Sequence, residues 1–185
     1  DVAWVIGSFY AVGSNMYGWR QGIESQFSKN QFVDTKIINN QASLDDREIK
    51  LYVESAGYND GNYARILINS ESPFIVGRGI NVAAISGTTG EILFTHTFDT
   101  YADPQNSEAL AEHINNLPDG SFVLCAIKDE GSASMTENGY LALESIGSDF
   151  CRNVGIRDSW AIIGIKGADP GSVPEAHKLS GEGTV

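Results

Sequence analysis

SFVLCAIK, residues 121–128, is the stretch that decides the fold. Its apolar residues follow one another almost without interruption, whereas a strand with one solvent-facing side alternates apolar and polar residues. We therefore predict a central strand that is covered on both faces. The sequence around it contains both strand and helix patterns, which together indicate a compact α+β fold.

A helix is predicted just before this strand. Asn106 or Ser107 can cap its amino end, and Pro118-Asp119-Gly120 can stop it. Between these signals the apolar stripe has helical spacing and consists of Leu110, Ile114 and Leu117.

A second helix is predicted after the strand. Ser134-Met-Thr-Glu137 is a capping-box pattern, and the helix should run to about Ser145, with Gly147 as its stop. The last predicted strand is SWAIIGIK, residues 159–166. Everything after Gly167 is rich in Pro, Gly and Ser without periodicity, so we expect a surface tail or linker there.

The remaining strands form hairpins. INVAAIS (80–86) and EILFTHTF (91–98) flank a glycine turn at 87–90. Residues 1–70 hold four β-branched and aromatic runs, and Asp60-Gly61 predicts a tight turn between the last two. These runs are residues 4–12, 31–38, 48–56 and 63–69. Residues 18–30 could instead form a short helix.

Length and charge limit the function classes. The chain has 185 residues, enough for one domain or one domain with an appendage, and a formal net charge of −12. The acidity is concentrated after Ser70, with 16 acidic against 6 basic residues. Such a field repels nucleic acid and anionic membranes, and no apolar run is long enough to span a bilayer. We expect no nucleic-acid partner and no membrane insertion.

The two cysteines leave the compartment open. Cys125 lies inside the apolar run, where a reduced thiol is the default, although a bridge to Cys151 is possible. The sequence contains no Asn-x-Ser/Thr acceptor for N-glycosylation.

Catalytic and cofactor motifs are missing. There is no Gly-x-Ser-x-Gly elbow, no His-x-x-x-His and no Cys-x-x-Cys. The acidic loop 99–103 lacks the ligand series of a calcium site and is better explained as a helix cap, while Gly77-Arg78-Gly79 is too short for a phosphate loop. We predict no enzyme activity, no metal site and no cofactor.

Polar residues stand at the ends of several apolar strands, and such ends can converge at one rim of a sheet. Two arginines around a carboxylate, with an aromatic platform for the ring, suit the vicinal hydroxyls of a sugar. The candidate carbohydrate-binding residues are Arg78, Asp129, Arg157 and Asp158, with Tyr101 or Trp160 as platforms. Two alternatives stay open: an ion pair that merely pins strand ends, and a glycosidase that uses Asp129 with Glu130 or Asp158.

Six blocks of the sequence together resemble the interleukin-like EMT inducer (ILEI or PANDER) domain over about residues 47–172. They are GRGINV, TGEIL, FDTY, LPDGSFVLCAIKDEGS, LESIGS and GIRDSWAIIGIKG. The resemblance implies a compact β-β-α fold with two sheets and flanking helices. It leaves residues 1–46 as a β-rich extension and 173–185 as a flexible tail.

The resemblance also implies functions. Members of this family occur as secreted cytokine-like proteins, in phage tail fibres, and in the stem of protein O-linked-mannose N-acetylglucosaminyltransferase, without a shared catalytic activity. In that stem the domain binds terminal N-acetylglucosamine through residues that match Arg78, Asp129 and Arg157. Ile156 stands where the stem has Trp, and the extra paired cysteines of the cytokine-like members are missing.

We therefore expect a non-catalytic, lectin-like module whose partner is a glycan or glycoprotein. The alternative is a protein-interaction or assembly module, either cytokine-like or part of a phage fibre, that could form homo-oligomers through residues 1–46. In either case the expected location is extracellular, or on a virion or cell surface.

Overall fold

The computed structural model describes residues 9–12, 15–16, 33–37 and 47–185. The helix considered between residues 18 and 30 lies outside the described residues, as does most of the predicted extension 1–46. The described elements are β1 (Phe9–Val12), β2 (Asn15–Met16), β3 (Val33–Ile37), β4 (Arg47–Gly57), η1 (Tyr58–Asp60), β5 (Tyr63–Ile68), β6 (Gly79–Ile85), β7 (Ile92–Phe98), α1 (Pro104–Asn115), β8 (Phe122–Asp129), α2 (Glu137–Glu144), η2 (Cys151–Asn153), β9 (Ser159–Ile165) and β10 (Glu175–Lys178).

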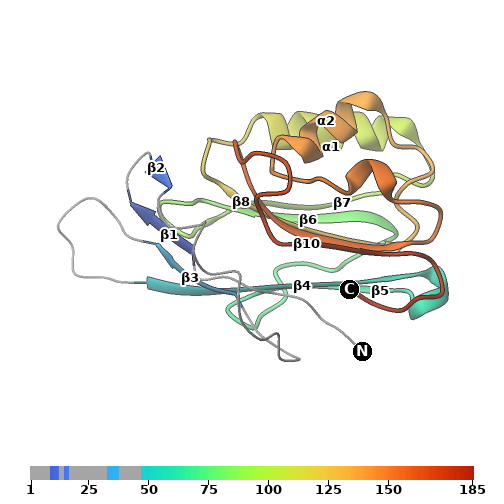
Figure 1. Cartoon of the computed structure of the whole chain (residues 1–185), viewed down its shortest axis with the longest axis horizontal. Helices are drawn as coiled ribbons and strands as arrows, with labels where there is room; N and C mark the ends of the chain where they lie inside the picture. Colours follow the sequence, from blue (N-terminus) through green and yellow to red (C-terminus); the bar gives the residue numbers. More distant parts are fainter. Residues whose placement is uncertain (1–8, 13–14, 17–32, 38–46) are drawn as a thin grey trace.

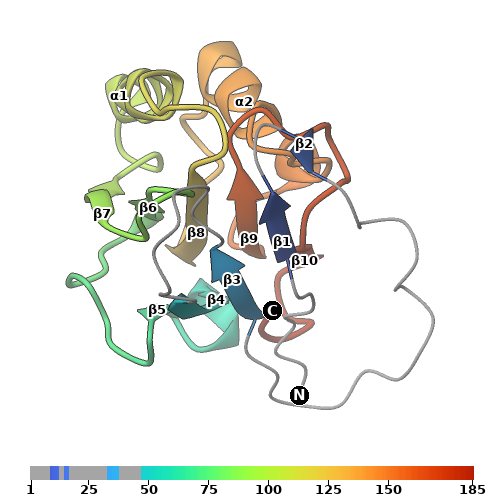
Figure 2. The ribbon, with the colours of Figure 1, turned by 90° about the vertical axis from the view of Figure 1, so that its left-hand side faces the viewer.

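Strand β8 lies at the centre, as its apolar run predicts. It pairs antiparallel with β6 on one side and β9 on the other, and β7 and β10 pair outside these. Helices α1 and α2 cover one face of this part of the sheet (Figures 1 and 2). Residues 122–127 of β8 are at most 3% exposed, so burial on both faces explains why polar residues do not alternate in the run.

Strands β3, β4 and β5 form a layer on the opposite face, with antiparallel pairing between neighbours (Figure 2). The two layers are joined, because Ala56 and Gly57 of β4 pair in parallel with Lys128 and Asp129 of β8. The described strands therefore form one hydrogen-bonded network arranged in two layers.

The junction depends on one hydroxyl. Beyond the Ala126–Ala161 pair, β8 and β9 separate, and β4 enters between them. Ser55 Oγ donates to the Ile127 carbonyl at 2.7 Å and accepts from the Trp160 N–H at 3.0 Å. It thereby satisfies two backbone groups that the separated strands can no longer pair with each other.

Both predicted hairpins and both predicted helices are present; the acidic loop 99–103 caps the first helix, as predicted, whereas Asn106, Ser107 and Ser134 are not the cap residues. Asp103 caps α1, accepting from the Gln105 N–H at 2.9 Å, and Pro104 takes the first turn. Thr136, not Ser134, caps α2, since its hydroxyl accepts from the Gly139 N–H. The stripe of Leu110, Ile114 and Leu117 is buried, as predicted.

The prediction of a flexible tail at 173–185 is wrong. Residues 175–178 form β10 on the edge of β9, and Val173 and Val185 are buried. Asp60 accepts hydrogen bonds from the N–H groups of Gly181 and Gly183, at 2.9 and 2.8 Å. Proline and glycine break up periodicity here but do not prevent packing, because local turns present the backbone to β4 and β9.

Both cysteines are free and buried, and burial raises the pKa of each thiol. They do not form the bridge that the sequence allowed. None of the described helices is long and apolar enough to cross a membrane.

Candidate functional site

The polar strand ends meet at one rim of the sheet. Gly79 at the start of β6 is opposite Lys128 at the end of β8, and Gly57 at the end of β4 is opposite Asp129. Phe98 of β7 pairs with Ile80 of β6, so the residues after β7 lie at the same edge. We call this edge the strand-end rim; it comprises Tyr58, Arg78, Asp99, Tyr101, Asp129, Ile156 and Arg157.

Arg78 and Asp99 form a bidentate ion pair at one side of the rim. The Arg78 Nε and Nη2 groups donate to the two Asp99 oxygens at 3.0 and 2.8 Å. The hydrogen bonds lower the pKa of Asp99 and raise that of Arg78. The guanidinium also lies 4.6 Å above the centre of the Tyr101 ring. Tyr101 is about half exposed, but one face of its ring is already covered by Arg78.

Asp129 and Arg157 have left-handed backbone conformations, with φ values of 67° and 65°. Residues other than glycine adopt this region rarely and at a cost, and such residues cluster at functional sites. No hydrogen bond from the described residues engages the Asp129 carboxylate or the Arg157 guanidinium. Their hydrogen-bonding atoms are therefore available to a ligand, while Asp129 also interacts electrostatically with Arg78.

The buried side chain of Glu130 holds the backbone around Asp129 and Arg157 in place. It is 1% exposed, and its Oε1 atom accepts from the Ser132 hydroxyl at 2.7 Å and from the Ala133 N–H at 3.2 Å. Its Oε2 atom accepts from the backbone N–H of Arg157. One buried carboxylate thus connects the loop after β8 to the loop before β9 and sets where Asp129 and Arg157 lie.

Tyr58 completes the rim on the β4 side. The Arg157 guanidinium carbon lies 4.4 Å from the centre of its ring, and Tyr58 and Ile156 are 49% and 69% exposed. Gly57 permits this approach, because a Cβ atom there would lie 2.0 Å from the Arg157 carbonyl oxygen. An exposed Tyr, Ile and Arg beside one another are residue types that anchor protein interfaces.

Two predicted site residues do not belong to the rim. The Trp160 ring is 1% exposed and donates to Glu175 at 2.7 Å, so it cannot serve as a platform for a sugar. Asp158 is 4% exposed, and both its oxygens accept hydrogen bonds from His177, Gly155 and Ser180. Trp160 is covered because every residue of β9 is buried, and Asp158 lies directly before that strand, whereas Arg157 belongs to the preceding turn and has a left-handed conformation.

No sequence pattern indicated Tyr58 or Glu130 as partners of Arg157. Tyr58 belongs to a turn that is far from Arg157 in the sequence, and the two meet because the end of β4 lies against the residues at the start of β9. Asp99 was assigned to an acidic loop before the helix, but its role as the partner of Arg78 follows from the β6–β7 hairpin register.

The carboxylate pairs that the sequence suggested for a glycosidase are not available. Glu130 and Asp158 are buried and occupied by internal hydrogen bonds, so neither can act together with the half-buried Asp129. Within the described residues, no group of three or more His, Cys, Asp or Glu side chains is placed to hold a metal ion.

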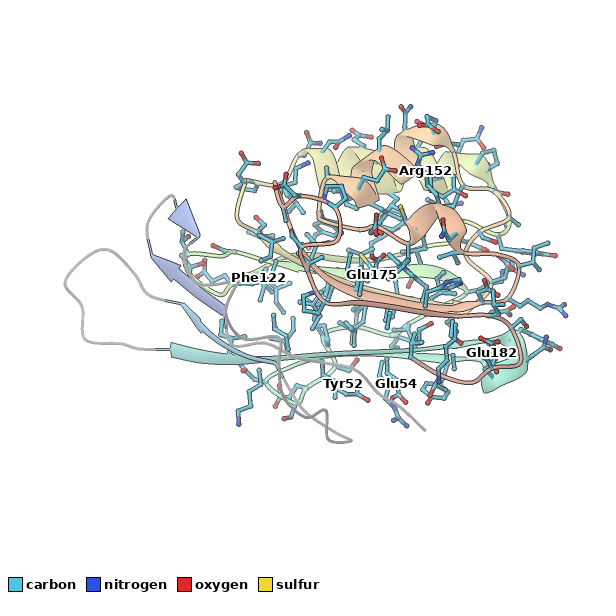
Figure 3. All side chains as sticks on the ribbon, in the orientation of Figure 1. Tyr52, Glu54, Phe122, Arg152, Glu175 and Glu182 are labelled. Atoms are coloured by element: carbon cyan, nitrogen blue, oxygen red, sulfur yellow. The ribbon has the colours of Figure 1, made fainter. Side chains whose placement is uncertain are left out.

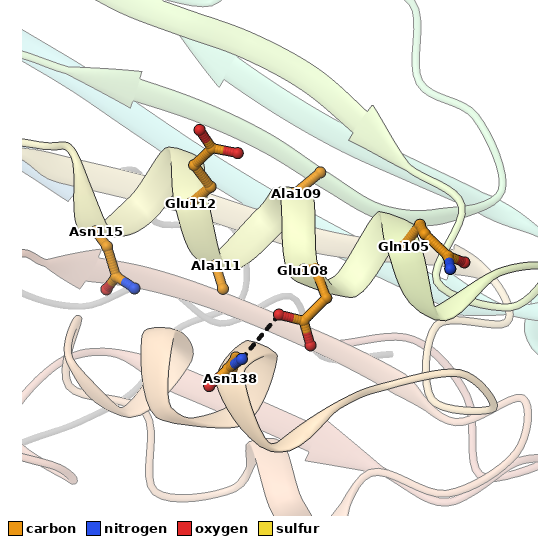
Figure 4. A pocket seen from close by; sticks show the side chains of 7 residues that line it. All are labelled: Gln105, Glu108, Ala109, Ala111, Glu112, Asn115 and Asn138. Carbon is orange, nitrogen blue, oxygen red and sulfur yellow. Dashed lines mark hydrogen bonds between the residues drawn. The ribbon is translucent and has the colours of Figure 1, made fainter.

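Two further polar features lie away from the rim. On the outer face of β4, where Figure 3 labels Tyr52 and Glu54, the Glu54 carboxylate accepts hydrogen bonds from the hydroxyls of Tyr52 and Tyr63 and from Arg65. Burial, together with Glu54, raises the pKa of Tyr52 to about 12. Between α1 and α2 there is an open groove, crossed by a 2.8 Å hydrogen bond from Asn138 to Glu108 (Figure 4). The hydrogen bonds within each feature indicate a structural role: those of Glu54 hold β4 to β5, and the bond from Asn138 to Glu108 holds α1 to α2.

Part of the chain is similar to known proteins. Residues 78–168 match the sequence model of the family described as interleukin-like EMT inducer. Mouse cell migration-inducing and hyaluronan-binding protein is 34% identical over 100 residues, which are 54% of this chain and 7% of that protein. Mouse protein FAM3D is 36% identical over 92 residues, or 49% of this chain and 40% of the relative, and rat protein FAM3C is 35% identical over 102 residues, or 55% and 44%.

The matched part of the chain spans less than half the length of each of these relatives. It runs from Arg78 at the rim to Ala168 just after β9, and so contains both helices and the four strands β6 to β9. Residues 78–168 are a domain of the interleukin-like EMT inducer family.

Proposed function

We propose that this chain is a non-catalytic, extracellular recognition module that binds a protein partner through the strand-end rim. The observation that carries the proposal is the pair Asp129 and Arg157, whose left-handed backbone presents two charged groups that make no hydrogen bond within the described residues, beside the exposed Tyr58 and Ile156. The family match supports a cytokine-like role, which the resemblance implies, and gives no support to a virion surface.

Binding to cells tests this proposal. The labelled full chain should bind saturably to cultured animal cells, and trypsin treatment of the cells should abolish that binding. Arg157→Ala and Asp129→Asn each remove one charged hydrogen-bonding group, a loss of about 1.5–3 kcal/mol, and should weaken binding roughly 10- to 100-fold.

Arg152→Ala is the matched control. Arg152 is also exposed, but it lies on the helical layer, where it pairs with Glu137 and Glu144 (Figure 3). Its variant should bind like the wild type. If Arg157→Ala and Asp129→Asn also bind like the wild type, the rim is not the binding surface.

A glycan is the second candidate ligand, because Arg78, Asp129 and Arg157 lie at neighbouring positions along the same rim. A glycan array that includes terminal N-acetylglucosamine and hyaluronan separates this candidate from the first. The net charge of −12 disfavours an acidic polymer such as hyaluronan, even though one relative is named for binding it. Binding to cells that resists trypsin but is lost after glycosidase treatment would replace the protein partner with a sugar.

A further inference from the structure

Two exposed histidines lie side by side where α1 packs on the edge strand β7. The ring of His96, on β7, is 5.8 Å from the ring of His113, on α1, measured between centroids, and the two rings are within 12° of parallel. Phe94 and Phe98 contact the same pair from one face of β7. Strand β7 has a pairing partner only in β6 within the described residues, so one edge of this cluster faces solvent.

The hydrogen bonding of His113 prepares one nitrogen for a metal ion. Its Nδ1 atom lies 2.8 Å from the Ala109 carbonyl oxygen, which can only accept, so Nδ1 carries the proton and Nε2 keeps its lone pair. A ring nitrogen that donates to a backbone carbonyl is typical of histidines that bind metal through the other nitrogen. No hydrogen bond within the described part of the chain occupies the ring nitrogens of His96.

The spacing of the rings suits a shared ion. Two imidazoles that bind one ion at 2.0–2.1 Å have ring centroids about 4.5 to 6.4 Å apart, for ligand angles from 90° to 180°. The observed 5.8 Å falls inside this range, and binding requires one exposed ring to turn out of the stacked arrangement so that both in-plane lone pairs point at the same ion. Both side chains are exposed, so an ion can reach them from solvent, and the net charge of −12 raises the local concentration of cations.

We propose that His96 and His113 form a two-histidine site for a transition-metal ion that favours imidazole, with Cu²⁺ bound more tightly than Ni²⁺ or Zn²⁺. Water completes the coordination, since no third His, Cys, Asp or Glu of the described residues joins the pair. The ion connects the edge strand β7 to α1. Ca²⁺ and Mg²⁺, which prefer oxygen ligands, do not bind there.

Titration of the full chain with Cu²⁺, followed by electron paramagnetic resonance, tests the site. One ion should bind per chain, the spectrum should show coupling to imidazole nitrogen, and the ion should raise the Tm. His96→Phe keeps an aromatic ring against Phe98 but removes the ligand. This variant should lower the Cu²⁺ affinity at least tenfold. A loss of about tenfold is already typical when only the hydrogen-bond partner of a ligating imidazole is changed, and here the ligand itself is removed.

His113→Gln is the second variant, because its amide can still donate to the Ala109 carbonyl while it removes the imidazole. It should also lose at least tenfold in affinity. His177→Gln is the matched control: His177 is the third histidine of the chain, bonded to Asp158 at 2.8 Å, and its loss should leave Cu²⁺ binding unchanged. If His96→Phe or His113→Gln bound Cu²⁺ with wild-type affinity, the proposal would be wrong. It would also be wrong if light scattering showed that Cu²⁺ converts the chain to a dimer, because the ion would then be shared by two chains.

Discussion

At the scale of single residues, the buried hydroxyl of Ser55 has the largest structural effect for its size. It satisfies the Ile127 carbonyl and the Trp160 N–H where β8 and β9 separate. Ser55→Ala should leave both groups buried without a partner and lower the free energy of unfolding by about 2–4 kcal/mol. Urea unfolding measures this loss. Ser72→Ala, whose hydroxyl bonds the Phe74 carbonyl in an exposed turn, should cost less than about 0.5 kcal/mol.

An equal, small effect of the two serine variants would mean that water or a shift of β4 replaces the Ser55 hydroxyl. In that case the Ser55 hydroxyl would not determine where Tyr58 lies at the rim, although Gly57 and Tyr58 follow directly from this part of β4.

At the scale of elements, the two helices approach each other through Gly139 of α2 and Ser107 of α1. A Cβ atom at Gly139 would lie 2.1 Å from Ser107 Oγ. Ser107 is fully buried and accepts from the Thr136 N–H at 2.9 Å, so it cannot turn away without breaking that bond. Gly139→Ala should therefore destabilise the protein by about 1–3 kcal/mol, although alanine is normally the better helix residue by about 1 kcal/mol.

Thermal unfolding measured by circular dichroism checks this prediction. Asn138→Ala, one residue earlier, removes only the exposed bond to Glu108 and serves as the control. A higher Tm for Gly139→Ala than for the wild type would show that the helices separate easily, and that helix propensity governs this position.

At the scale of the whole molecule, the local patterns were predictable and the long-range pairing was not. The apolar run of β8, the glycine turn between β6 and β7 and the stripe on α1 each specify an element from neighbouring residues. The entry of β4 between β8 and β9 depends on contacts between residues about 70 and 100 positions apart, such as Ser55 with Ile127 and Trp160. No periodicity in the sequence encodes such a contact.

The candidate site divides in the same way. Arg78, Asp129 and Arg157 stand next to strands whose ends could be located from the sequence, and the rim contains all three. Trp160 was misplaced because β9 is buried along its whole length, by packing partners that are distant in the sequence. The packing of residues 173–185 was missed because it is specified by Asp60 and Asp158, which are distant in the sequence.

The same long-range bonds make the stability of the whole protein sensitive to acid. Burial acts to raise the pKa of Asp158, but hydrogen bonds from His177, Gly155 and Ser180 outweigh it, so the pKa lies below its usual value of 3.8. The pKa values of Asp99 and Glu137 are also lowered, by hydrogen bonds from Arg78 and Arg152. A carboxyl whose pKa is lower in the folded state contributes stability above its unfolded value, and this contribution is lost as the pH falls through the folded value.

Urea unfolding at pH 6, 4 and 3 should therefore show a steady loss of stability below about pH 4, the region of the unfolded carboxyl pKa. Asp158→Asn should be less stable than the wild type at pH 6, and the difference should shrink at pH 3, where the wild-type carboxyl begins to take up its proton. The exposed Asp169→Asn should show a small difference at every pH. A constant gap between Asp158→Asn and the wild type from pH 6 to pH 3 would show that the ionised carboxylate is not what ties the carboxyl-terminal segment to β9.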